Sequence, residues 1–262
     1  MRRVLATLAL AIALPSMAQT PPKVYAAGSL KSALAEAAAL FKVVGGGEIA
    51  FEFGPSGVLR DRLAKGEAAD VFASANMEHP KALADAGKAE PVRMFARNSM
   101  CAVAHPELNL NQGNFLPTLL DPNVKLATST PKADPSGDYA WLVFERAEKI
   151  KPGAYEALSK KALQLVGGPN SPAPPSNRSL YGLLLERGDA DLFLTYCTNA
   201  TIAKREVPSL VVVPLPESLS VGAEYGLVTM NGASAASKTF ADFLLSPAGQ
   251  SVLQRAGFAP PR

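Results

Sequence analysis

The residues best suited to chemistry in this chain are serines at points where predicted strands turn into predicted helices. A serine hydroxyl at a helix start can satisfy an orphan backbone N–H, but those N–H groups and the helix dipole can instead hold an anion. An oxyanion only accepts hydrogen bonds, so neutral donors can satisfy it. One such turn is more simply a helix cap, whereas the set together favours an anion site. The turns are Gly28-Ser29, Pro55-Ser56-Gly57, Pro135-Ser136-Gly137 and residues 176–179.

Catalytic candidates are poor by comparison. His79 and His105 are the only histidines, and neither has a Cys or His neighbour at metal-ligand spacing. The turn around Ser56 is not the Gly-x-Ser-x-Gly elbow of hydrolases, and the glycines do not form a nucleotide-binding pattern. We therefore predict a protein that is not an enzyme and has no metal site. The alternative is a secreted serine hydrolase that uses Ser56 or Ser29, which would need a general base nearby.

Size and charge narrow the class further. The chain has 262 residues and 48% hydrophobic content, which fits one large domain or two lobes. The net charge of +3 is small and the basic residues are dispersed, so no nucleic-acid partner is expected.

The N-terminal sequence and the cysteines indicate in which cellular compartment the protein works. Arg2 and Arg3 precede an apolar run over residues 4–14, and small residues follow at Ser16 and Ala18. This pattern predicts a signal peptide, residues 1–18, cleaved near Ala18; the run is too short to span a membrane. In an oxidising compartment the two cysteines could form a disulfide, or they could be two separate buried thiols.

Strands and helices alternate along the mature chain, which predicts an α/β fold with parallel sheets. In such sheets ligands bind beyond the carboxyl ends of strands, where the serine turns lie. The long extended run 92–104 has polar residues in its middle, so we expect a strand that leaves one sheet and enters another, with a hinge near Arg97-Asn98. A return crossing is expected between 214 and 225. Strands are predicted at 23–27, 49–53, 70–75, 125–128, 163–166, 191–196, 210–214 and 225–230.

Several motifs together carry a family resemblance. Over nearly the whole mature chain, the sequence resembles the periplasmic molybdate-binding proteins of ABC importers. The three motifs between residues 26 and 75 are fairly specific in combination, whereas the motif at residues 245–250 is shared by many binding proteins. The motifs are Ala26-Ala27-Gly28-Ser29-Leu30, Phe53-Gly54-Pro55-Ser56-Gly57, Ala69-Asp70-Val71-Phe72-Ala73-Ser74-Ala75, Arg97-Asn98-Ser99, Tyr196, Leu245-Ser246-Pro247-Ala248-Gly249-Gln250 and Gly257-Phe258.

The resemblance implies a two-lobed periplasmic binding protein with two crossing strands, the type II arrangement. Lobe 1 would comprise residues 19–97 plus 215–262, and lobe 2 residues 98–214. The lobes would close on the ligand as a hinged clamp. The implied function is capture of molybdate, with tungstate as a close mimic, and delivery to an ABC transporter permease. The protein would act in the periplasm as a monomer without a cofactor.

The resemblance also implies which residues hold the anion. Ser29 and Ser56 would bind it through hydroxyl and backbone N–H groups. Backbone N–H groups at about Ser136 and Arg178 would contribute from lobe 2, and the hydroxyl of Tyr196 would complete the site.

Two departures from the family pattern leave the ligand open. The family turn is often serine-rich where this chain has Gly54-Pro55-Ser56-Gly57, and Arg178 replaces a small or apolar residue. An inward guanidinium would suit another anion, such as an organic carboxylate, whereas the preferred outward orientation would leave a solvated side chain. Sulfate is a further alternative. The usual strand order of the fold would place Cys101 and Cys197 on neighbouring strands of lobe 2, which allows a disulfide.

Overall fold

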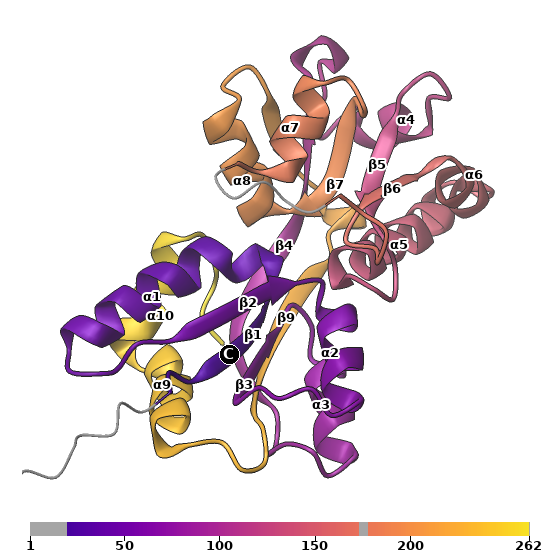
Figure 1. Ribbon diagram of the computed structural model, residues 1–262. Helices are drawn as coiled ribbons and strands as arrows, with labels where there is room; N and C mark the ends of the chain where they lie inside the picture. The colour runs from indigo at the N-terminus through magenta and orange to yellow at the C-terminus, as the bar shows by residue number, and fades with distance from the viewer. Residues whose placement is uncertain (1–19, 173–177, 262) are drawn as a thin grey trace, which may run out of the picture.

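The computed structural model describes residues 20–172 and 178–261 and shows two lobes joined by two long strands (Figure 1). The predicted signal peptide and residues 176 and 177 of the last serine turn lie outside the described residues. Within the described ranges, no helix has the length and apolar character needed to span a bilayer.

Lobe 1 is built on parallel strands whose alternate side chains fill two cores. Strand β1 (Lys23–Ala27) pairs with β2 (Ala50–Gly54) on one side and with β3 (Val71–Ser74) on the other. Val24 and Ala26 face the core shared with α1 (Lys31–Val43), α9 (Ala235–Leu245) and α10 (Pro247–Arg255). Tyr25 faces the core under α2 (Ser56–Ala64) and α3 (Glu78–Asp85). Because successive side chains of a strand point to opposite faces, the sheet buries apolar side chains on both faces and is covered by helices on each.

Lobe 2 repeats this construction. Strand β5 (Leu126–Ser129) lies between β6 (Leu163–Val166) and β7 (Leu192–Tyr196), and all three are parallel. Strand β8 (Val211–Pro214) pairs with the crossing strand β4. The helices are α4 (Phe115–Leu120), α5 (Pro135–Ile150), α6 (Ala154–Lys161), α7 (Leu180–Glu186) and α8 (Cys197–Glu206).

Two antiparallel strands connect the lobes. β4 (Arg93–Ala104) pairs with β9 (Gly222–Thr229) through its first half, and with β7 and β8 through its second half. The crossing over residues 92–104 is thus present. The return crossing lies in the predicted segment between 214 and 225. The chain leaves β8, which pairs with the second half of β4, and enters β9, whose first residues pair with Arg97–Ser99. The segment also holds a short 3-10 helix, Glu217–Leu219. The division into lobe 1, residues 19–97 plus 215–262, and lobe 2, residues 98–214, stays a prediction.

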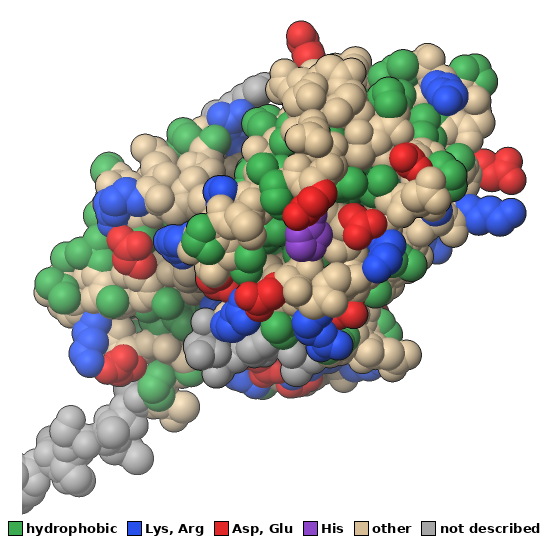
Figure 2. Space-filling view, turned by 90° about the horizontal axis from the view of Figure 1, so that it is seen from above, with side chains coloured by type: hydrophobic (Ala, Val, Ile, Leu, Met, Phe, Trp, Pro, Cys, Tyr) green, Lys and Arg blue, Asp and Glu red, His purple; other side chains and the backbone are tan. Residues whose placement is uncertain are grey.

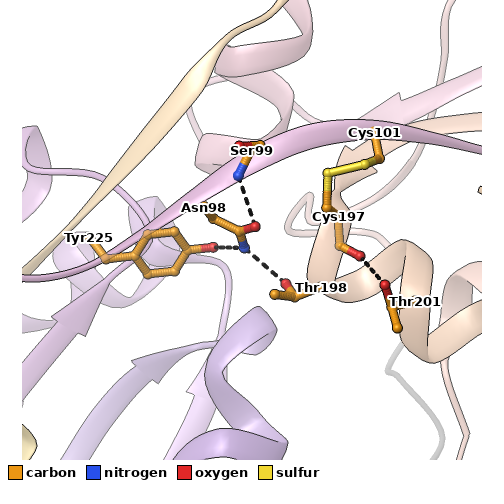
Figure 3. Close-up of a disulfide and its surroundings, with 7 residues drawn as sticks. All are labelled: Asn98, Ser99, Cys101, Cys197, Thr198, Thr201 and Tyr225. Carbon is orange, nitrogen blue, oxygen red and sulfur yellow. Dashed lines mark hydrogen bonds between the residues drawn. A yellow bond between two sulfur atoms is a disulfide. The ribbon is translucent and has the colours of Figure 1, made fainter. Parts of the chain in front are cut away.

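The two cysteines form a disulfide (Figure 3). Cys101 lies on β4, and its Cα is 4.8 Å from that of Cys197. Cys197 is the first residue of α8 and directly follows β7, the neighbour of β4. The bond therefore links the crossing strand to the helix that begins beside Tyr196.

Candidate anion-binding site

Ser56 is the first residue of α2, at the carboxyl end of β2, and is completely buried. The sequence predicted it at or beside the N-cap; the N-cap residue is Pro55, and the Ser56 side chain makes no capping bond. Its Oγ instead accepts the N–H of Ala75, just after β3, at 3.1 Å. Since that bond uses an oxygen lone pair, the Ser56 proton remains available to donate.

Ser29 lies in a 3-10 turn, η1 (Gly28–Leu30), that precedes α1. The sequence predicted it as the N-cap of the following helix, and this is wrong, because α1 begins after Leu30 and has no side-chain cap. The Oγ of Ser29 lies 3.0 Å from the hydroxyl of Tyr225 on the crossing strand β9.

Asn98 fixes the direction of these hydrogen bonds. Its Oδ1 accepts the backbone N–H of Ser99, so its Nδ2 must be the donor to Thr198 Oγ1, at 2.9 Å, and to the Tyr225 hydroxyl oxygen, at 3.3 Å (Figure 3). Tyr225 can then donate its own proton to Ser29, which leaves the Ser29 proton free. Burial raises the pKa of Tyr225 far above its ordinary value, so the phenol stays protonated. The sequence predicted Asn98 as part of a hinge and of a family motif, but not as a hydrogen-bonding partner of the site, and it did not single out Tyr225.

Tyr196 ends β7 and is 1% exposed. Its hydroxyl donates to the carbonyl of Ala75 at 3.2 Å, so a side chain of lobe 2 contacts the backbone of lobe 1. The same Ala75 donates its N–H to Ser56. Burial raises the pKa of Tyr196 well above its ordinary value, so this hydroxyl also stays a neutral donor.

A second contact between the lobes is made at Gly57. Its N–H donates to the carbonyl of Ala133, just before α5, at 2.9 Å. A Cβ at this position would lie 2.8 Å from the Ala133 oxygen and closer still to the carbonyl oxygen of Lys132. Only glycine therefore allows the start of α2 to approach the start of α5 as closely as it does in this structure.

Ser136 is the second residue of α5, and its hydroxyl is buried without a hydrogen-bond partner among the described residues. Its N–H donates to Oδ1 of Asp134 at 3.2 Å. Asp134 is thus the N-cap residue of α5, which sequence reasoning missed. Asp followed by Pro135 is a common N-cap and first-turn pair, and that signal could have identified it.

Asp134 is an unusual carboxylate for a helix start. Its pKa is raised from 3.8 to about 6, mainly through loss of hydration and to a smaller extent by the nearby carboxylate of Asp138. Hydrogen bonds from Ser136 N–H and from Ser129 oppose the shift. No cation of the described chain contributes to it. The ionised form of Asp134 is therefore destabilised in the folded protein.

Replacing Asp134 with asparagine should stabilise the protein at neutral pH, since asparagine caps helices as well as aspartate. The folded-state pKa is above the unfolded value, so the cost of the aspartate develops between about pH 4 and pH 6 and is complete above that. The expected gain in unfolding free energy is about 1–3 kcal/mol at pH 7 and near zero at pH 4. Urea unfolding at both pH values measures it; equal stability at pH 7 would contradict the account.

Arg178 is directed along α7. Its Nη1 lies 2.9 Å from Glu186 Oε2, and the side chain is partly exposed. This agrees with the outward orientation preferred from the sequence. The described contacts do not bring Arg178 to Ser29, Ser56, Ser136 or Tyr196, and its predicted backbone role stays a prediction.

Replacing Arg178 with glutamine should therefore change anion affinity by less than about threefold, because a surface ion pair is worth at most about 1 kcal/mol. Calorimetric titration of both proteins tests this. A loss of affinity beyond about tenfold would show that the guanidinium reaches the ligand.

Three separate hydrogen-bonded paths thus cross between the lobes. Ser56 is linked to Tyr196 through Ala75, Ser29 is linked to α8 through Tyr225 and Asn98, and Gly57 bonds directly to Ala133 before α5. A hollow of about 720 Å³ also lies along the crossing strands, lined by Asn98, Tyr139 and Glu224 among others, but by none of the predicted site residues. On the face of the molecule seen in Figure 2, acidic and basic side chains are interspersed.

Comparison with known proteins agrees with this architecture. Residues 22–259 match the family described as "Bacterial extracellular solute-binding protein". The uncharacterized protein PM1146 of Pasteurella multocida is 35% identical over 214 residues, covering 81% of this chain and 88% of the relative. The molybdate-binding protein ModA of Escherichia coli is 28% identical over 243 residues, covering 90% and 87%.

Two solved structures share the fold at low identity. The periplasmic molybdate-binding protein of Azotobacter vinelandii has a TM-score of 0.73 and 20% identity, covering 92% of this chain and 100% of that one. The sulfate-binding protein SubI of Mycobacterium tuberculosis has a TM-score of 0.74 and 18% identity, covering 92% and 87%. The molybdate- and sulfate-binding proteins among these relatives bind solutes as transport proteins; they are not enzymes and carry no cofactor. This chain belongs to the bacterial extracellular solute-binding protein family, whose members work outside the cytoplasm.

Proposed function

We propose that this protein captures molybdate, with tungstate as a close mimic, between its lobes and delivers it to the membrane permease of an ABC importer. It would be exported by the signal peptide of residues 1–18 and would act as a monomer in the periplasm. The proposal is supported by family membership and by the similarity to the E. coli molybdate-binding protein.

One observation carries the proposal: the site presents hydroxyl protons that have no internal acceptor assigned to them. The Ser56 oxygen accepts from Ala75, and the Ser29 oxygen can accept from Tyr225 because Asn98 donates to that tyrosine. Each serine can therefore donate outward. A ligand that only accepts hydrogen bonds matches this arrangement, and a tetrahedral dianion is such a ligand.

Closure would complete the site from the second lobe. Tyr196 is a neutral donor, and its present bond to the Ala75 carbonyl would be exchanged for one to the anion. The N–H of Ser136 is the donor nearest the start of α5, where the helix dipole favours negative charge. The second lobe thus adds donors to those of Ser29 and Ser56 when the clamp closes.

The test is a calorimetric screen of the mature chain against molybdate, tungstate, sulfate and citrate, repeated on Ser56→Ala. A hydrogen bond to a charged group contributes about 1.5–3 kcal/mol, so the variant should bind molybdate at least about tenfold more weakly. Ser234→Ala is the matched control, because Ser234 caps α9 and should leave the affinity unchanged.

Other outcomes assign other functions. Binding of sulfate or citrate without molybdate would establish the alternative anions. Labelling of Ser56 or Ser29 by a fluorophosphonate probe would instead revive the serine hydrolase.

A further inference from the structure

The carboxylate of Asp134 lies at the start of α5, where the proposed function places an anion. The residue before it, Ala133, accepts the N–H of Gly57 from lobe 1 at 2.9 Å. The Oδ1 atom of Asp134 accepts the N–H of Ser136 at 3.2 Å. That N–H is one of the donors assigned to the anion. A Cβ built on Gly167 would lie 2.6 Å from Oδ2, so the loop after β6 packs against the carboxyl group. Asp134 is therefore held in place at the contact between the lobes.

The groups that face Asp134 are neutral hydroxyls and a second carboxylate. Ser129 of β5 hydrogen-bonds to it, and Asp138 lies one turn along α5. The negative charge of Asp134 acts on the hydroxyls of Tyr181 from α7, Tyr196 from β7 and Tyr225 from β9. The backbone N–H of Lys132 donates to Asp138, and the Lys132 charge acts on Asp138 rather than on Asp134. Asp134 thus shares its surroundings with the hydroxyls assigned to the ligand.

An ionised Asp134 and a dianion bound at the start of α5 would repel each other. Two negative groups in one site raise the pKa of the weaker acid, and burial has already raised that of Asp134 to about 6. A neutral Asp134 removes the repulsion, releases its hold on the Ser136 N–H, and gains a proton that it can donate. The unpartnered hydroxyl of buried Ser136 lies in the same first turn and offers a further donor.

We propose that Asp134 takes up one proton from solvent when the anion binds and returns it when the anion leaves. The inference rests on the proposed function, because it requires an anion at the lobe interface. The proton uptake makes the affinity for the anion higher in an acidic medium than in an alkaline one.

The sign of the pH dependence follows from linkage. Below about pH 6 Asp134 is already protonated in the free protein, and the affinity is independent of pH. Above that value a proton must be taken up, so the affinity falls by up to about tenfold per pH unit until the pKa of the complex is passed.

The experiment is calorimetry of wild type, Asp134→Asn and Asp138→Asn with molybdate, tungstate and sulfate, in a pH range where each stays a dianion. Two buffers of different ionisation enthalpy at each pH give the number of protons taken up. Wild type should take up close to one proton above pH 7 and bind up to about 100-fold more weakly at pH 8.5 than at pH 6.5. Asp134→Asn should take up none, bind with constant affinity and exceed wild type at pH 8.5, whereas Asp138→Asn should keep the pH dependence.

The outcomes separate the two proposals. Wild-type binding that is independent of pH, or a pH dependence that survives in Asp134→Asn, would overturn the proton coupling and leave the anion-binding function standing. If wild type binds none of the three dianions, the proposed function fails and the coupling fails with it. Thermal unfolding of each variant verifies that it is folded before titration.

Discussion

Replacing Gly57 with alanine should prevent full closure of the lobes and weaken anion binding by at least about 100-fold. The added Cβ would lie 2.8 Å from the carbonyl oxygen of Ala133 and closer to that of Lys132, and backbone atoms at a helix start cannot move aside cheaply. The lobes must then stay apart, so the anion loses the donors of the second lobe. Loss of about two charge-assisted hydrogen bonds, each worth about 1.5–3 kcal/mol, gives this factor.

Calorimetry with molybdate measures the affinity, and small-angle scattering with and without ligand measures closure. Gly47→Ala is the matched control, because a Cβ there meets no atom within 4 Å. The clash lies between lobes rather than inside one, so the unfolding free energy of Gly57→Ala without ligand should stay close to that of wild type. Binding at wild-type affinity would show that the contact between Gly57 and Ala133 does not belong to the ligand-bound state.

Removing the disulfide should have the largest effect on stability. The bond between Cys101 and Cys197 closes a loop of 96 residues. In the chain-entropy account, a loop of this length stabilises the fold by about 4–5 kcal/mol through restriction of the unfolded chain. The double variant Cys101→Ala/Cys197→Ala should lose about that amount from its free energy of unfolding.

Urea unfolding with and without reductant checks this. Reductant should lower the stability of wild type toward that of the double variant and leave the variant itself unchanged. A difference below about 1 kcal/mol between oxidised wild type and the variant would contradict the expected contribution.

The strands were predictable from sequence because their signal is local. The apolar run of β6 matched its predicted bounds, and the crossing strand β4 was expected from its length and its polar centre. The first residues of β9, Gly222 to Glu224, were missed because they lack an apolar pattern and become a strand through backbone pairing with Ser99 to Arg97. The sequence also missed α4, which has only six residues and is too short to show a helical period.

The site was only partly predictable. Serine at a turn suggested caps at Ser29 and Ser56, but distant partners took both hydroxyls, and Tyr225 is 196 residues from Ser29. Local propensity cannot anticipate such contacts, because they depend on which strands become neighbours. Asp134 was missed although its cap signal is local, and only the fold reveals that this half-buried carboxylate loses enough hydration to raise its pKa.

The central claim is that the two lobes hold an acceptor-only oxyanion through neutral donors. Calorimetric titration of molybdate into the mature chain at pH 6.5 tests it most directly, with sulfate and citrate titrated in parallel. The account predicts saturable binding of one molybdate per chain, displaced by tungstate and not by sulfate or citrate. No binding of molybdate or tungstate, with saturable binding of citrate, would contradict it.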